Sequence, residues 1–264
     1  MTTVIAAIDE SAATLPVLEA ARRLAAVLGA EVEAVHVQEN GSGRTAAEIA
    51  MSASVPLRLR DGDVVAVLAS EVRERDAVAL VIGTRALLGG PYPAGHVALD
   101  LVQLLDRAIV VVPPNATDRP VRRILVAVEG DGESRSLRGV FDWLGEHPSP
   151  EVVALHVVEP DDLPMFADSP VLEAEAFGRE FLLRSIGAIA ADASRVRLET
   201  RVGDAPRALR AAVDELDVDL VVLAWHRDLS GGHGRLVREM LGEATVPVVL
   251  LPRQRRRSNV RVPG

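Results

Sequence analysis

Residues 81–97 read Val81-Ile82-Gly83-Thr84-Arg85-Ala86-Leu87-Leu88-Gly89-Gly90-Pro91-Tyr92-Pro93-Ala94-Gly95-His96-Val97. This stretch passes from an apolar strand through a loop rich in glycine and proline into an amphipathic helix. Proteins of the α/β class hold phosphate at such junctions, because the first N–H groups of the helix carry a partial positive charge and glycine lets the main chain approach an anion. The stretch therefore predicts an α/β fold with a candidate anion site, although a glycine loop alone is a weak signal.

Strands and helices alternate through the first 114 residues. Runs rich in apolar residues predict five strands, at 3–8, 31–37, 55–60, 77–82 and 109–112. Apolar residues at helical spacing predict the helices between them, and in the helix that follows the opening loop the inward positions are Val97, Leu101, Leu104, Leu105 and Ala108. This alternation is typical of a mostly parallel, doubly wound sheet.

The same order of elements recurs after a proline-rich stretch at 113–120. Early positions of the two copies correspond at an offset of 120 residues, and later positions at an offset of 141. The matching pairs are Asp9 with Glu129, His36 with His156, Gly62-Asp63 with Gly203-Asp204, and Gly83 with Ala224. The second copy therefore carries 21 extra residues, which we expect within 161–192, where an amphipathic pattern predicts a helix.

The repeat predicts two tandem doubly wound α/β domains. We place the first at 1–114 and the second at 122–253, with a linker at 115–121 and an arginine-rich tail at 254–264. The tail could contact an acidic partner, but a solvated charged end is the commoner interpretation of such a run.

The composition excludes several kinds of chemistry. The chain of 264 residues has no cysteine, and all 29 basic residues are arginine. Disulfides, thiolate nucleophiles, lysine Schiff bases and lysine-dependent phosphate loops are therefore ruled out. The net charge of −9 argues against specific nucleic-acid binding, which needs a basic face. Because no signal-like leader or membrane-length apolar run is present, we expect a cytoplasmic protein with no membrane partner.

Four features of the sequence resemble the universal stress protein family. They are the acidic end of the first strand (Ala6-Ala7-Ile8-Asp9), the His36-Val37 end of the second strand, the Gly-Asp pair before the next helix, and Gly83-Thr84-Arg85 followed by Gly95-His96-Val97-Ala98. Their order and spacing extend over both copies, so the resemblance covers nearly the whole chain. It implies a five-stranded parallel sheet of order 3-2-1-4-5 in each copy, with helices on both faces. It also implies that the copies pack about a pseudo-two-fold axis through their last strands.

The resemblance further implies a nucleotide site in the first copy. Family members that bind ATP carry Gly-x2-Gly-x9-Gly-Ser/Thr in the loop, with an Asp after the first strand and a Val after the histidine of the second. Carried over to this chain, ATP or another adenine nucleotide would contact Ala7, Asp9, Val37, Gly83, Arg85, Gly95, His96 and Val97. The loop departs from the pattern because Ala86 replaces the second glycine, His96 replaces the small hydroxyl residue, and one residue is missing. Asp9 could instead be a turn residue that caps the first helix.

The second copy departs further from the pattern. Glu129 stands in place of the Asp, residues 224–227 lack both glycines, and the loop to Gly234 is three residues short. Trp225 is bulky enough to occupy a base-sized cavity, and Arg235 is interpreted as a surface arginine, although its guanidinium could pair with phosphate. The second copy is therefore predicted not to bind nucleotide.

No arrangement of residues predicts catalysis or a resident metal. His36 and His156 have no nucleophile or metal partner near them in sequence and are interpreted as structural. The spacing of His226, Asp228 and His233 matches no standard metal site. We therefore expect a protein that is not an enzyme, either a nucleotide-dependent sensor with an unidentified protein partner or a ligand-independent interaction protein with degenerate loops. An ATP-consuming enzyme is the least supported alternative, and two chains could assemble into a homodimer with four copies.

Overall fold

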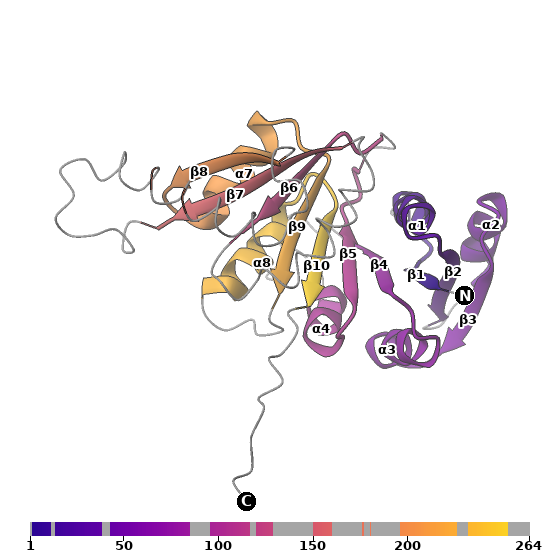
Figure 1. Cartoon of the computed structure of the whole chain (residues 1–264). Helices are drawn as coiled ribbons and strands as arrows, with labels where there is room; N and C mark the ends of the chain where they lie inside the picture. Colours follow the sequence, from indigo (N-terminus) through magenta and orange to yellow (C-terminus); the bar gives the residue numbers. More distant parts are fainter. Residues whose placement is uncertain are drawn as a thin grey trace, which may run out of the picture.

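The structure is a computed structural model that describes residues 2–11, 14–38, 43–84, 96–116, 120–128, 150–159, 176, 180, 196–225 and 232–252. The strands in these ranges form one sheet of ten, in the order β3-β2-β1-β4-β5-β10-β9-β6-β7-β8 (Figure 1). Each half of the sheet thus has the predicted order 3-2-1-4-5, which confirms the two-copy α/β architecture.

The first half consists of five parallel strands and four described helices. The strands are β1 (Thr3–Ala7), β2 (Glu31–Gln38), β3 (Leu57–Asp61), β4 (Ala79–Gly83) and β5 (Ala108–Val112). The helices are α1 (Thr14–Leu28), α2 (Arg44–Ser52), α3 (Val64–Glu74) and α4 (His96–Leu104). In Figure 1, α1 and α2 lie on one side of the strands and α3 and α4 on the other, as in a doubly wound sheet.

The second half repeats this plan. Its strands are β6 (Arg123–Ala127), β7 (Glu151–Val158), β8 (Val196–Val202), β9 (Leu220–Trp225) and β10 (Val248–Pro252). Its described helices are α7 (Ala205–Glu215) and α8 (Gly232–Glu243). The helix expected within 161–192 lies outside the described residues, except that Ala176 and Glu180 are helical.

The two halves are joined through their last strands. β5 and β10 pair antiparallel, with Val110 opposite Val249 at the centre of the seam. All other neighbouring strands of the sheet are parallel. An antiparallel pair of equivalent strands is what a two-fold axis between the copies requires, so the predicted pseudo-two-fold arrangement is confirmed.

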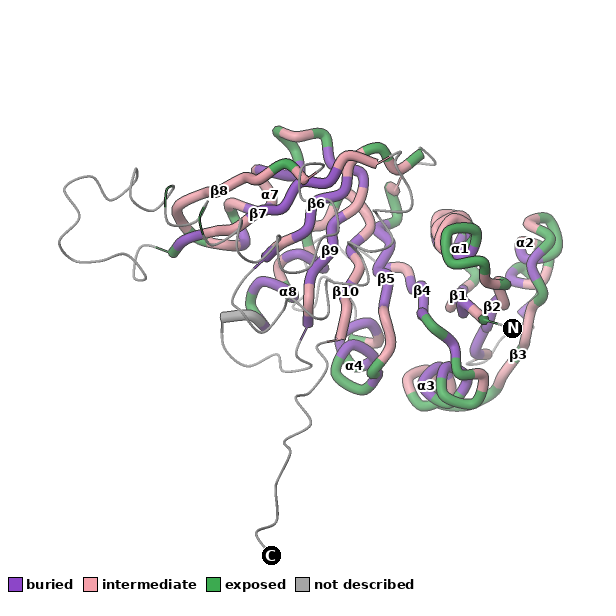
Figure 2. The backbone as a smooth tube through the Cα atoms, in the orientation of Figure 1, coloured by how far each residue is buried: buried purple, intermediate pink, exposed green. Residues whose placement is uncertain are grey.

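One hydrophobic core runs through both halves on a single face of the sheet. It contains residues of α3 and α4 from the first half and of α7 and α8 from the second, packed on inward positions of the strands. Smaller clusters lie on the opposite face of each half. Figure 2 shows the inner strands of the sheet as largely buried, which explains why their sequences are so continuously apolar, whereas the edge strands β3 and β8 contain no buried residue.

Several predicted element ends differ from the structure by one or two residues, and two differences have a clear physical basis or consequence. The third strand begins at Leu57 rather than residue 55, because Pro56 has no N–H to donate to a strand ladder. α4 ends at Leu104, whose side chain is 43% exposed, and Ala108 already belongs to β5. The buried face of α4 consists of Ala98, Leu99, Leu101 and Val102, so the inward assignment of Leu104 and of a helical Ala108 is wrong.

The described helices are short, and the longest, α1, has 15 residues. Within the described parts of the chain, none is long and apolar enough to cross a membrane.

Candidate functional site

The carboxyl ends of β1 and β4 form a switch point in the first half. The two strands are parallel neighbours, with Ala7 opposite Ile82. The chain leaves β1 for α1, on one face of the sheet, and leaves β4 for α4, on the other (Figure 1). Doubly wound sheets bind ligands at such a point, outside the carboxyl ends of the strands.

Four residues, which we call the switch-point residues, mark this place: Ala7, Val37, Gly83 and Val97. Val37 belongs to the core on the α4 side, and Ala7 and Val97 pack against the same cluster while remaining partly exposed. Gly83, the last residue of β4, is also partly exposed. Apolar groups from the ends of two strands and the first turn of α4 therefore lie on one side of the sheet, an arrangement that can accept a flat apolar group.

Asp9 forms a turn directly after β1. Its Oδ1 accepts hydrogen bonds from the backbone N of Ser11 at 2.9 Å and from the Ser11 hydroxyl at 2.6 Å. The hydroxyl of Thr14, the first residue of α1, lies 2.6 Å from the Asp9 carbonyl oxygen and 3.1 Å from Oδ1. The turn role of Asp9 is therefore confirmed, while a nucleotide contact by the same carboxylate stays a prediction.

The two repeated histidines have the same role in each half. Nδ1 of His36 lies 3.0 Å from the carbonyl oxygen of Ile8, and Nδ1 of His156 lies 2.8 Å from that of Val128. A carbonyl oxygen only accepts, so Nδ1 carries the proton and donates in both cases. Each histidine ties the residue after the first strand of its half to the second strand, which confirms the structural interpretation.

The phosphate-binding part of the predicted site is only partly described. Arg85, Ala86 and Gly95 lie outside the described residues, so their roles stay predictions. His96 is the first residue of α4 and is exposed. Its imidazole therefore stands at the positive end of a helix whose first N–H groups have no partner within the helix.

Arg235 of the second half is held by two carboxylates. Its Nη2 donates to Oδ2 of Asp204 at 2.6 Å, and its Nε donates to Oε1 of Glu239 at 2.7 Å. These hydrogen bonds raise the pKa of Arg235, and the bond to Glu239 has the largest effect. The surface interpretation of this arginine is confirmed, and its guanidinium already has acidic partners where a phosphate would otherwise pair.

The structure places Trp225 in the interior of the molecule, between the two halves. The indole is 3% exposed, belongs to the core shared by the two halves, and donates from Nε1 to the carbonyl oxygen of Val102 in α4 at 3.0 Å. The sequence related this side chain only to the second copy, whereas the structure shows that it also contacts the first.

The other residues considered for chemistry in the second half are incompletely described. Glu129, His226 and Asp228 lie outside the described residues, and the side chain of His233 is not described. Among the side chains that the structure does describe, no group of three or more His, Asp or Glu residues could hold a metal ion.

A sequence model of the universal stress protein family matches residues 120–252. The chain belongs to the universal stress protein family. The matched range spans half of the chain and covers the second copy, whereas the first copy repeats the same strand order. A tandem pair of universal stress protein domains is compatible with this arrangement.

Two solved structures with TM-scores near 0.7 share this fold over nearly the full length of the chain. A universal stress protein from Archaeoglobus fulgidus DSM 4304 aligns with a TM-score of 0.70 at 15% identity, covering 96% of this chain and 98% of the other. A functionally unknown protein from Pseudomonas aeruginosa PAO1 aligns with a TM-score of 0.69 at 16% identity, covering 96% and 93%. A universal stress protein in complex with cAMP covers 43% of this chain and 97% of its own, with a TM-score of 0.37 at 21% identity. Likeness at these identities concerns the fold alone, and no curated protein matches the sequence.

The repeated Gly-Asp pair of this universal stress protein starts a helix in each half. Gly62 and Gly203 have φ angles of 126° and 138°, in the region that favours glycine. Asp63 then accepts a hydrogen bond from the backbone N of Ala66 at 2.8 Å, and Asp204 accepts one from that of Arg207 at 3.2 Å. The pair is a local helix-start signal.

A second feature that recurs in both halves, an Asp after a helix, was not predicted from the sequence. Asp76 and Asp217 stand 141 residues apart, follow α3 and α7, and have φ angles of 47° and 49°. Asp tolerates this left-handed conformation better than most residues. The carboxylate of Asp76 also pairs at 2.6 Å with Arg107, which directly precedes β5. The recurrence of Asp at the repeat offset is the signal that could have identified both turns.

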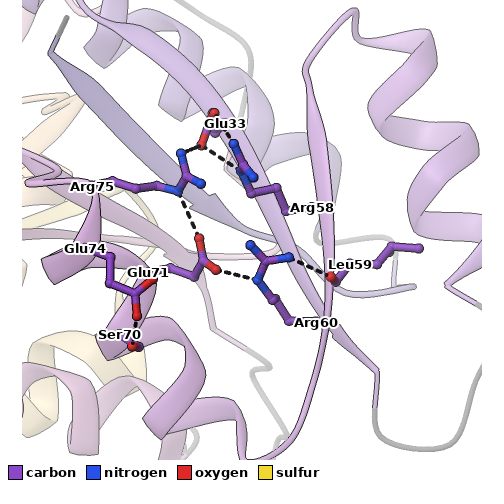
Figure 3. Close-up of polar contacts among 8 residues, drawn as sticks. All are labelled: Glu33, Arg58, Leu59, Arg60, Ser70, Glu71, Glu74 and Arg75. Carbon is purple, nitrogen blue, oxygen red and sulfur yellow. Dashed lines mark hydrogen bonds and ion pairs between the residues drawn. The ribbon is translucent and has the colours of Figure 1, made fainter.

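A cluster of five charged side chains fastens α3 to the edge of the sheet (Figure 3). Glu71 of α3 accepts from Nε of Arg60 at 2.5 Å and from Nε of Arg75 at 2.9 Å. Nη1 of Arg75 also lies 2.7 Å from Glu33, which pairs in turn with Arg58 of β3 at 3.2 Å. The carboxylates and guanidiniums alternate, so the cluster is a structural ion-pair network and we assign it no ligand.

Proposed function

We propose that this universal stress protein binds an adenine nucleotide, with ATP as the leading candidate, at the switch point of its first half. The observation that carries the proposal is that Ala7, Val37 and Val97 pack on one cluster beside the end of β4, while Ala7 and Val97 stay partly exposed. In this proposal the base lies against these apolar residues. The phosphates lie toward Gly83 and the first turn of α4, where His96 is exposed.

The proposal assigns binding to the first half only. In the second half, the position equivalent to His96 is Arg235, whose guanidinium bonds Asp204 and Glu239. A phosphate there would have to displace two charge-assisted hydrogen bonds. This difference between the halves favours one nucleotide per chain.

We also propose that the nucleotide is bound rather than consumed. Asp9, two residues after the switch-point residue Ala7, uses its Oδ1 to form the turn that leads into α1. A carboxylate held in this way is poorly placed to act as a general base. Nucleotide occupancy would then alter the shape of the protein or its choice of a protein partner, and prolonged incubation with Mg-ATP should release no phosphate.

Calorimetric titration of the full chain with Mg-ATP and with AMP tests the binding proposal. One site per chain is expected, and Gly83→Val should abolish it by placing a branched side chain at the end of β4. Ala224→Val is the matched control, because Ala224 is the equivalent position in the second half, and it should leave the Kd within about twofold. Loss of binding in Ala224→Val but not in Gly83→Val would place the site in the second half and contradict the proposal.

The alternative function is a ligand-independent interaction protein. It is favoured by the engagement of Asp9 in its own turn and by the departures from the ATP pattern at Ala86 and His96. Thermal unfolding separates the two functions, since a ligand at a hundredfold its Kd stabilises the folded state by about 2.7 kcal/mol and would raise the Tm by roughly 5–10 °C. No change in Tm and no heat at millimolar nucleotide would favour the alternative.

A further inference from the structure

Trp225 connects the second half of the molecule to a helix of the first. It is the last residue of β9, and its indole N–H donates to the carbonyl oxygen of Val102 across the seam between the halves. The bond is 3.0 Å long and buried. A hydrogen bond in such surroundings is well shielded from competition by water.

The acceptor is a carbonyl that α4 leaves without a helical partner. The last four carbonyls of a helix have no N–H four residues further along within the helix, and Val102 lies in the last turn of α4, which ends at Leu104. The indole of the second half therefore caps the carboxyl end of a first-half helix. The repeat-equivalent residue in the first half is Thr84, which has no indole to offer, so this cap breaks the pseudo-two-fold symmetry.

The opposite end of α4 carries His96 and the switch-point residue Val97. α4 has nine residues, so its two ends are only about 12 Å apart. Its middle is fixed by the buried side chains of Ala98, Leu99 and Leu101. A helix this short moves as one rigid body. A contact that fixes its carboxyl end therefore also positions its first turn.

We propose that Trp225 is a positioning residue for the first-half site, acting from the second half through α4. The inference rests on the proposed function, because it assigns Trp225 a part in nucleotide binding without contact to the nucleotide. It also gives the second copy a role in the tandem chain, as the domain that holds α4 for its neighbour. The second half then supports the site without having to bind nucleotide itself.

The test compares Trp225→Phe with Val249→Ala in the full chain. Phe keeps an aromatic ring in the core but lacks the N–H, and Trp225→Tyr serves as a second variant if the first folds poorly. Val249 lies in the same seam but packs on the face of the sheet opposite to α4, so its truncation weakens the seam without touching the cap. Unfolding in urea measures the stability of each variant.

Calorimetry with Mg-ATP provides the first readout. Loss of one net hydrogen bond from the cap should raise the Kd of Trp225→Phe by about fivefold, while Val249→Ala stays within about twofold of the parent. Equal Kd values for Trp225→Phe and the parent, or equal increases in both variants, would overturn the positioning role while leaving the proposed function intact.

Hydrogen exchange of residues 96–104 without ligand provides the second readout. Faster exchange in Trp225→Phe but not in Val249→Ala is expected if the indole holds α4. If the parent binds no Mg-ATP, the proposed function fails and this comparison alone decides whether Trp225 positions α4. Unchanged exchange in Trp225→Phe would then refute the inference.

Discussion

Glu71 occupies the centre of the ion-pair network beneath α3, with a side chain that is only 6% exposed. Burial, the largest single influence, raises the pKa of this carboxyl group, but hydrogen bonds from Arg75 and Arg60 and the charges of both arginines outweigh it. The pKa of Glu71 is therefore below its ordinary value. A carboxyl group whose pKa is lowered by folding stabilises the protein above its unfolded pKa and loses that contribution as the pH falls through the folded pKa.

Glu71→Gln should lower the free energy of unfolding by about 1–3 kcal/mol at pH 7, because it leaves two arginines without their shared anion. The difference from the parent should begin to shrink near pH 4.3, the ordinary pKa at which Glu is protonated in the unfolded chain, and should disappear as the pH falls through the lower pKa of Glu71 in the folded protein. Urea unfolding at several pH values measures both effects.

Glu74→Gln is the control for this prediction. Glu74 lies on the same helix, is exposed, and accepts a hydrogen bond from the Ser70 hydroxyl at 2.6 Å. Its substitution should change the stability by less than about 0.5 kcal/mol. A penalty for Glu71→Gln that does not vary with pH would show that packing, rather than charge, stabilises this position.

At the scale of the element, each Gly-Asp pair connects an edge strand of the sheet, β3 or β8, to the helix that follows and forms the start of that helix. The glycine takes a positive φ, and the Asp that follows accepts a hydrogen bond from the first turn of α3 or α7. All the groups involved lie within five residues. This locality is the reason that the pair recurs unchanged in both halves although most neighbouring residues differ.

Asp63→Ala should destabilise the protein by about 1 kcal/mol, because α3 loses its side-chain cap. Asp63→Asn should retain most of the stability, since the amide oxygen of Asn caps equally well. Chemical denaturation of the two variants measures their free energies of unfolding and thereby distinguishes the contribution of the capping hydrogen bond from that of the negative charge. Similar losses in both would attribute the effect to the attraction between the carboxylate and the helix dipole.

At the scale of the whole molecule, the core on the α4 side does not stop at the boundary between the copies. It joins α3 and α4 to α7 and α8 through the paired strands β5 and β10, and the Trp225 indole lies within it. Unfolding of one half would therefore expose apolar surface of the other half to water. The two halves should therefore behave as one cooperative unit.

This cooperativity predicts one unfolding transition for the full chain. In a Trp143→Phe background, Trp225 is the sole tryptophan, and its emission should change at the same urea concentration as the circular dichroism of the whole chain. Two separate midpoints would show that the halves unfold independently and that the seam contributes little to stability.

Several features of this protein follow from the sequence by itself. Buried parallel strands need apolar runs, and helix starts need their glycine and acidic residues within a few positions, so the inner strands and the Gly-Asp helix starts could be recognised locally. The strand order of each domain was predicted from the family resemblance and is confirmed. The placement of Ala7, Val37 and Gly83 at strand ends follows from the same patterns. Asp76 and Asp217 were missed because one Asp after a helix is a common residue, and only its φ angle reveals the turn.

Only the tertiary structure decided the roles that depend on partners distant in the chain. Trp225 and Val102 are separated by 123 residues, and Arg235 and Asp204 by 31, so no local pattern relates them. The sequence around Trp225 suggested a blocked cavity, whereas the packing of the two halves makes its indole the cap of α4. The physical reason is that a buried N–H must find an acceptor, and which carbonyl it finds depends on how the two halves of the sheet meet along β5 and β10.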